Sequence, residues 1–165
     1  MNTSLIRIKI PQYVKIIERK VFYNCRCLKS VEFYKNSELI SIEDNAFYHT
    51  SINKIDIPSK TKYIQFCAFY KCYELNEVKF ANKSELIMID VLAFEYTSIS
   101  NFCVPSSLKY YQELALEDIK LIKFEENSEL ISIDTDILSG SENSFFIPDN
   151  VKEIVKHTLL DDKIN

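Results

Sequence analysis

Residues 52–72 read INKIDIPSKTKYIQFCAFYKC, and residues 5–25 read LIRIKIPQYVKIIERKVFYNC. Both segments pass from an alternating apolar stretch through a proline to a second apolar anchor, and then to an aromatic residue. A pattern that returns at a fixed spacing is the sequence signature of a repeat protein. Further copies of this pattern therefore determine how the whole chain is organised.

Four prolines mark the further copies. Pro11, Pro58, Pro105 and Pro148 are separated by 47, 47 and 43 residues, and each follows an apolar tetrad typical of a β-strand. A second series of short strands lies between them, and a loop containing Ser-Glu-Leu follows each member. Together the two series predict about seven coils of about 23 residues. The expected strands end at Ile10, Phe33, Ile57, Phe80, Val104, Phe124 and Ile147.

Each coil carries three apolar anchors, which are the strand, an apolar pair after it, and a large side chain that usually follows Ala. The third anchors are Phe22, Phe47, Phe69, Phe94, Leu116, Leu138 and Leu159. One such coil cannot bury a core alone, whereas stacked coils bury a continuous apolar column. We therefore expect a right-handed, leucine-rich-repeat-like solenoid with one short parallel strand per coil and turns or one-turn helices opposite. Proline after a strand stops the ladder because it has no N–H group.

Length and composition are consistent with this organisation. The chain has 165 residues, which suits one domain, and we expect a single solenoid over residues 1–165. The expected coils span residues 5–27, 28–51, 52–74, 75–98, 99–118, 119–141 and 142–165. A net charge of -4 argues against nucleic acid as a partner, and a single glycine excludes a glycine-rich phosphate loop. No apolar stretch is long enough to cross a membrane.

The compartment depends on whether the chain is complete. Arg7 and Lys9 interrupt the apolar N-terminus, so no secretory signal peptide is recognised. The cysteine count of five is odd, so at least one cysteine is unpaired. Without a signal peptide, the simplest interpretation is reduced thiols inside a cell. We expect a cytoplasmic protein if the chain is complete, and a cell-surface protein if it is a piece of a longer one.

The repeat resembles a known family. The pattern Leu-x-x-Ile-x-Ile-Pro, then Val-x-x-Ile, then Ala-Phe-x-x-Cys is similar to the BspA-like leucine-rich repeats, with the best matches at residues 5–25 and 52–72. The alternation of proline coils with Ser-Glu-Leu coils is most similar to the surface-antigen type of protists such as Trichomonas. The resemblance covers residue 5 to about residue 160. It implies a repeat protein of adhesion and recognition, often at cell surfaces, and binding instead of catalysis.

Cysteine and histidine residues could suggest metal or catalytic chemistry. Possible zinc ligands are Cys25, Cys27, His49, Cys67 and Cys72. Cys25 and Cys72, however, share one repeat position with Thr50, so small side chains that fill a slot in the core are the favoured interpretation. Neither His49, which we expect to be exposed, nor His157 has a partner pattern for nucleophilic catalysis. We expect no catalytic residue, metal or cofactor.

Two other recurrent features follow the repeat. Glu38, Glu85 and Glu129 occupy one position in alternate coils, and we expect them to cap backbone N–H groups of a turn. Tyr residues follow Phe in three successive coils, where they form either a stripe for a partner or glycan or a ladder that shields the core. The ladder is the favoured interpretation. These residues are Tyr23, Tyr48 and Tyr70.

The outward positions of the strands form the candidate binding face. They are Lys9, Glu32, Asp56, Lys79, Cys103, Leu121, Lys123 and Phe146. Mixed charge signs suit a protein partner, and the more apolar end around Cys103, Leu121 and Phe146 is the expected contact patch. The leading hypothesis is a non-enzymatic protein-interaction module. The alternatives are a surface adhesin fragment that binds host or matrix glycoprotein and, in another class, an enzyme or zinc protein.

The ends of the stack suggest a further property. Residues 1–4 are too few to cover the core of the first coil, which we expect at Ile8, Ile10, Val14 and Ile17. Terminal coils have one neighbour each and need a polar cap. We therefore expect end-to-end self-association.

Overall fold

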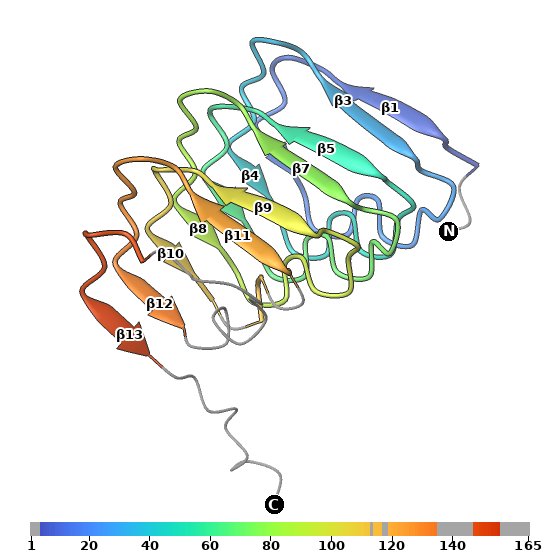
Figure 1. The fold of residues 1–165 in the computed structure, drawn as a ribbon. Helices are drawn as coiled ribbons and strands as arrows, with labels where there is room; N and C mark the ends of the chain where they lie inside the picture. Colours follow the sequence, from blue (N-terminus) through green and yellow to red (C-terminus); the bar gives the residue numbers. More distant parts are fainter. Residues whose placement is uncertain (1–3, 113, 117–118, 135–146, 156–165) are drawn as a thin grey trace, which may run out of the picture.

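Two rows of short parallel strands run along a stack of coils (Figure 1). The computed structural model describes residues 4–112, 114–116, 119–134 and 147–155, and within these residues there is no helix that could span a membrane. The front row contains β1 (Arg7–Ile10), β3 (Ser30–Phe33), β5 (Lys54–Ile57), β7 (Glu77–Phe80), β9 (Asn101–Val104) and β11 (Leu121–Phe124). The back row contains β2 (Ile16–Ile17), β4 (Ser41–Ile42), β6 (Tyr63–Ile64), β8 (Met88–Ile89), β10 (Tyr110–Tyr111), β12 (Ser132–Asp134) and β13 (Glu153–Val155).

The solenoid prediction is confirmed. Every front strand in the described ranges ends at the predicted residue, and the back row supplies one short strand to each of the expected seven coils. The predicted turns are present where the Ala-Phe segments lie, and no one-turn helix forms in the described residues. Leu138, Leu159 and His157 lie outside the described residues. The single-domain organisation and the coil limits stay predictions.

Strand pairing differs between the two rows. The front strands pair in twos, β1 with β3, β5 with β7 and β9 with β11, and Figure 1 shows these pairs as separate steps. The back row instead forms a continuous five-stranded sheet in the order β10-β8-β6-β4-β2, followed by the pair of β12 and β13. All of these pairs are parallel.

Proline explains where the front ladder stops. The residue after β7 donates its N–H to the preceding coil, because Ala81 N lies 3.1 Å from Ile57 O. Glu125, after β11, makes the same bond to Val104 O at 3.0 Å. The corresponding residues after β5 and β9 are Pro58 and Pro105, which have no N–H to donate toward β3 and β7. The front strand of each proline coil, β5 or β9, is therefore unpaired on the side of the coil before it.

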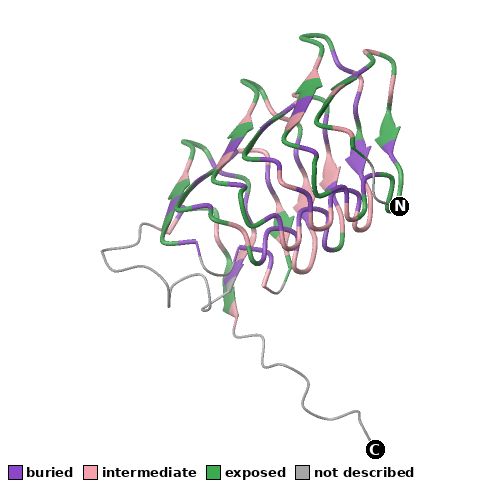
Figure 2. Cartoon of the chain, turned by 90° about the vertical axis from the view of Figure 1, so that its right-hand side faces the viewer, coloured by how far each residue is buried: buried purple, intermediate pink, exposed green. Residues whose placement is uncertain are grey.

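The Ala-Phe turns hold the core together. The side chains of Phe22, Phe47, Phe69 and Phe94 form one stacked column with ring centroids 5.1, 5.2 and 5.2 Å apart. Backbone bonds run beside this column, since each of the first three Phe N–H groups donates to the alanine carbonyl of the next coil at 2.8–2.9 Å. Figure 2 shows the buried residues along the interior of the stack. The small side chains of Ala46, Ala68 and Ala93 let the coils approach closely enough for both interactions.

The Ser-Glu-Leu loops close differently from the prediction, which assigned the capping role to Glu38, Glu85 and Glu129 and was wrong. The serine hydroxyl oxygens of Ser37, Ser84 and Ser128 each accept the N–H two residues later at 3.3 Å. The short serine side chain reaches this N–H, whereas the glutamates extend outward. Glu85 and Glu129 instead form exposed ion pairs with Lys62 and Lys109 of the preceding coils.

Turns without glycine impose left-handed backbone on residues with side chains. Two such positions recur four residues apart in four successive coils, and φ lies between 53° and 60° at all of them. The pairs are Lys20 and Asn24, Asn45 and His49, Cys67 and Lys71, and Leu92 and Tyr96. The left-handed conformation costs a residue with a Cβ about 1–2 kcal/mol. The stacking of the turns must therefore offset a strain that repeats with every coil.

The stacked column predicts unequal costs for two substitutions in one turn. Phe69 is fully buried between two rings, so Phe69→Ala should lower the free energy of unfolding by about 3–5 kcal/mol. Lys71→Ala is the matched control, since Lys71 loses a cation–π contact with Tyr70 and a hydrogen bond with Tyr48 and should cost less than about 1 kcal/mol. Urea unfolding of both variants measures the difference. Similar costs would contradict the inward and outward assignment.

Candidate interaction face

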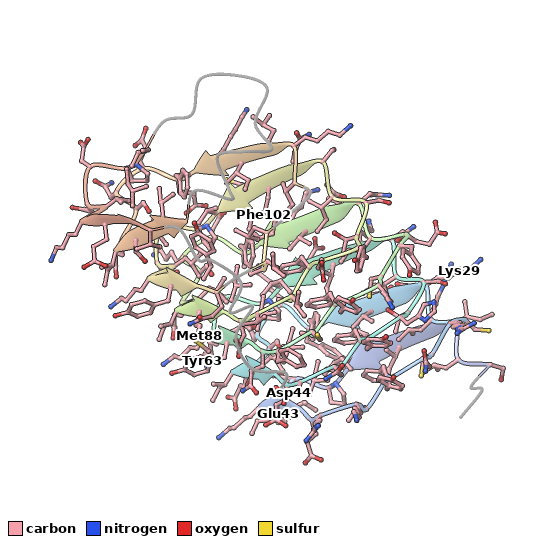
Figure 3. All side chains as sticks on the ribbon, turned by 90° about the horizontal axis from the view of Figure 1, so that it is seen from below. Lys29, Glu43, Asp44, Tyr63, Met88 and Phe102 are labelled. Atoms are coloured by element: carbon pink, nitrogen blue, oxygen red, sulfur yellow. The ribbon has the colours of Figure 1, made fainter. Side chains whose placement is uncertain are left out.

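The predicted outward positions are exposed on the front strands. This holds for Lys9, Glu32, Asp56, Lys79, Cys103, Leu121 and Lys123. Phe146, the remaining predicted residue, lies outside the described residues. The inward neighbours of these residues pack in the core, so the strands alternate as expected. Figure 3 shows the side chain of Phe102, which precedes Cys103, between the two rows of strands.

Two hollows divide the front face. The β3–β5 hollow has a volume of about 500 Å³ and brings together Lys9, Glu32 and Asp56. The β7–β9 hollow has a volume of about 540 Å³ and brings together Lys79, Cys103, Leu121 and Lys123. Both hollows lie where the front ladder is interrupted. The structure thus gathers the described residues of the predicted face into two separate sites.

Sequence reasoning missed the hollows and part of their lining. Tyr34 and Lys35 also line the β3–β5 hollow, and the buried Phe102 lines the β7–β9 hollow. Lys54 and Glu77, which alternation of the strands places outward, complete the charged lining of the two hollows. The available signal was the proline spacing, because a strand that ends in proline cannot pair on both sides. The 47-residue proline period therefore predicts a break in every second coil, although the volume of the resulting hollow depends on side-chain packing.

Charges in the hollows are only partly paired. Lys9 Nζ lies 4.1 Å from the centroid of the Tyr34 ring, and Lys79 Nζ lies 2.6 Å from Glu77 Oε1. Their hydrogen bond raises the pKa of Lys79 and lowers the pKa of Glu77. No ion pair within the described part of the chain involves Lys35, Lys54 or Lys123. These lysines are available to a partner.

The cysteines divide into two groups. Within the described residues no disulfide joins the five cysteines, of which Cys25, Cys67 and Cys72 are buried and Cys27 and Cys103 are exposed. The slot-filling role predicted for Cys72 is confirmed, since its sulfur lies 3.3 Å from Thr50 Oγ1 and donates to Phe47 O at 3.0 Å. Burial raises the pKa of Cys67 and Cys72 to about 11. Among the described residues, no three His, Cys, Asp or Glu side chains gather in a metal-binding group.

The tyrosines form the predicted ladder. Tyr23 and Tyr48 stack with centroids 4.6 Å apart, and Tyr48 and Tyr70 stack at 5.4 Å. Stacked rings cover one another's faces, which removes the flat surfaces that a glycan would need. The prediction that His49 is exposed was wrong: this residue is half-buried and contacts Tyr48 and Tyr73 edge-on. Burial, Arg26 and Lys71 lower the pKa of His49.

The first coil covers more of its core than expected. Ile10 and Ile17 are buried, and Ile8 and Val14 are half-buried. The prediction of an open first-coil core was therefore wrong for Ile10 and Ile17, because they pack against the second coil. Outward-facing Ile16 is exposed. End-to-end self-association stays a prediction.

The sequence matches a repeat-family model across most of its length. The family is described as the BspA-type leucine-rich repeat region, and six copies match within residues 1–123 and 83–165. The chain belongs to this family. Repeat arrays of this kind are scaffolds for protein interaction or for surface proteins. The protist origin suggested by the coil alternation stays a prediction. No curated protein matches the sequence.

A solved structure shares the fold over most of this chain. The pneumococcal vaccine antigen PcpA superposes with a TM-score of 0.70 at 24% identity, over 90% of this chain and 40% of that chain. A leucine-rich cell surface protein from Faecalibacterium prausnitzii gives a TM-score of 0.49 at 19% identity, over 92% of this chain and 50% of that chain. A leucine-rich repeat protein from Bacteroides ovatus gives a TM-score of 0.37 at 15% identity, over 90% of this chain and 74% of that chain. The likeness to PcpA supports the repeat fold, and this chain spans less than half of PcpA.

Thiol reactivity should separate the two cysteine groups. In the native protein at pH 8, Cys27 should react first with a small disulfide reagent and Cys103 next. Burial and Glu125 raise the pKa of Cys103, so its labelling rate should keep increasing as the pH is raised above 8. Cys25, Cys67 and Cys72 should react only after unfolding. Mass spectrometry of time points measures this order, and early labelling of Cys72 would contradict the packing described.

Proposed function

We propose that this chain is a non-enzymatic module that binds another protein through the front face. The observation that carries the proposal is the gathering of exposed, mixed-charge strand residues into two hollows on one side of the stack. Recurring side chains fill the other sides: the phenylalanine column occupies the interior and the tyrosine ladder covers the turn edge. The front face instead carries exposed residues whose identity changes from coil to coil.

The charge pattern of the face supports a protein partner. Lys9 lies beside Glu32, and Lys79 lies beside Asp56. Charges of both signs are therefore mixed over short distances, and no extended positive field is available for a phosphate backbone. The β7–β9 hollow adds the exposed Leu121 to this polar surface. A polar rim with apolar contacts inside is the usual composition of protein interfaces.

A surface adhesin is the second candidate. Asn82, in the sequon Asn82-Lys83-Ser84, is exposed beyond the end of β7, where a glycosyltransferase could reach it in a secreted chain. The partner would then be a host or matrix glycoprotein, and the chain would lie at a cell surface. A glycan on Asn82 in protein from the native source would favour this candidate over an intracellular interaction module.

Site-specific cross-linking tests the proposed face. A photoreactive phenylalanine analogue at Glu32 or Lys79 should give discrete cross-linked proteins in extracts of the native source, and excess unmodified protein should compete for them. The same group at Tyr63 is the matched control, since Tyr63 lies on the outer side of the back row beside Met88 (Figure 3). Cross-links from Tyr63 alone, or from none of the three positions, would contradict the proposal.

A further inference from the structure

The two hollows of the front face repeat at a fixed interval. One follows the break before the Pro58 coil and the other the break before the Pro105 coil, so their centres are two coils apart. Successive rings of the phenylalanine column lie 5.1–5.2 Å apart, so an interval of two coils places the hollows about 10 Å from one another along the stack. A partner that enters both hollows must present two groups at this separation.

We propose that the partner element is an acidic α-helix that lies along the stack and places two carboxylate side chains, seven residues apart, in the two hollows. The inference rests on the proposed function, because it names the kind of partner that the front face binds. It adds a geometry and a chemistry that binding by the face alone does not require.

Helix geometry matches the interval. A helix rises 1.5 Å per residue, so side chains seven residues apart lie on one face and are separated by about 10.5 Å along the axis. An extended segment does not match, because side chains on one of its faces recur at about 6.8 and 13.6 Å. Only the helix brings two neighbouring groups of one face to both hollows.

The hollows offer donors for carboxylates. Lys9, Lys35 and Lys54 outnumber Glu32 and Asp56 at the β3–β5 hollow. Lys79 and Lys123 outnumber Glu77 at the β7–β9 hollow. Each hollow therefore carries one excess positive charge in a chain whose net charge is -4. Charge-assisted hydrogen bonds to carboxylates are among the strongest available to a protein surface.

The interrupted ladders add backbone donors. Backbone N–H groups two residues apart on a strand point to the same side. The N–H of Asp56 therefore points to the same side as the backbone nitrogen of Pro58, which is toward the unpaired edge of β3. The N–H of Cys103 faces β7 in the same way, two residues before Pro105. A carboxylate in either hollow can thus accept from a lysine and from a main-chain N–H at once.

Two synthetic peptides test the inference against the isotope-labelled protein. Both are alanine-based helices of equal composition, with two glutamates seven residues apart in one and five residues apart in the other. The first should shift the amide NMR signals of residues lining both hollows and bind about tenfold more tightly, because only it engages both sites. Lys54→Ala and Lys123→Ala should each remove this advantage, and Lys152→Ala, on the back row, should not.

Each contrary outcome has a defined meaning. Equal binding of the two peptides, shifts at one hollow only, or no shift at millimolar peptide would overturn the helix proposal. Cross-linking from Glu32 and Lys79 is independent of the peptides, so it can still succeed if the partner has another shape. Loss of front-face cross-linking would remove the proposed function itself.

Discussion

The N–H group that Pro58 and Pro105 lack determines how the front of this stack is built. In every other coil, the residue after the front strand is a proline that cannot donate an N–H group to the coil before it, so the front strands form separate pairs. The back row has no proline and remains continuous from β2 to β10. The back row therefore connects successive coils by strand pairing, while the front row has unpaired strand edges and hollows where a partner can bind.

The interior tolerates this division because its own contacts do not depend on the front ladder. Rings stack from Phe22 to Phe94, and the turn backbones bond from coil to coil beside them. Tyr23, Tyr48 and Tyr70 extend the stacking to the edge. The ring contacts repeat through the first four coils, so the strands on the front there can vary in sequence and in pairing without loss of register.

Spacing made the fold predictable, because apolar anchors must align if the coils are to bury them together. That argument located the front strand ends from Ile10 to Phe124 and the exposed face that they carry. It could not show that Ser84, and not Glu85, accepts the backbone N–H that closes the loop, because both residues recur at the same period. Only the length of the side chain distinguishes the two residues. It also missed the left-handed backbone at Leu92, which reflects turn geometry and not residue preference. The hollows required the pairing of strands, which periodicity alone does not give.

Amide hydrogen exchange, resolved by NMR, tests the interrupted ladder most directly. The N–H groups of Asp56 and Cys103 face the unpaired edges, whereas those of Lys79 and Lys123 lie on the same side as the donors Ala81 and Glu125. All four residues are exposed at the centre of front strands, so they form a matched set. The account predicts that Asp56 and Cys103 exchange at least about tenfold faster than Lys79 and Lys123. Equal protection at all four amides would show a continuous front sheet and contradict the role assigned to the prolines.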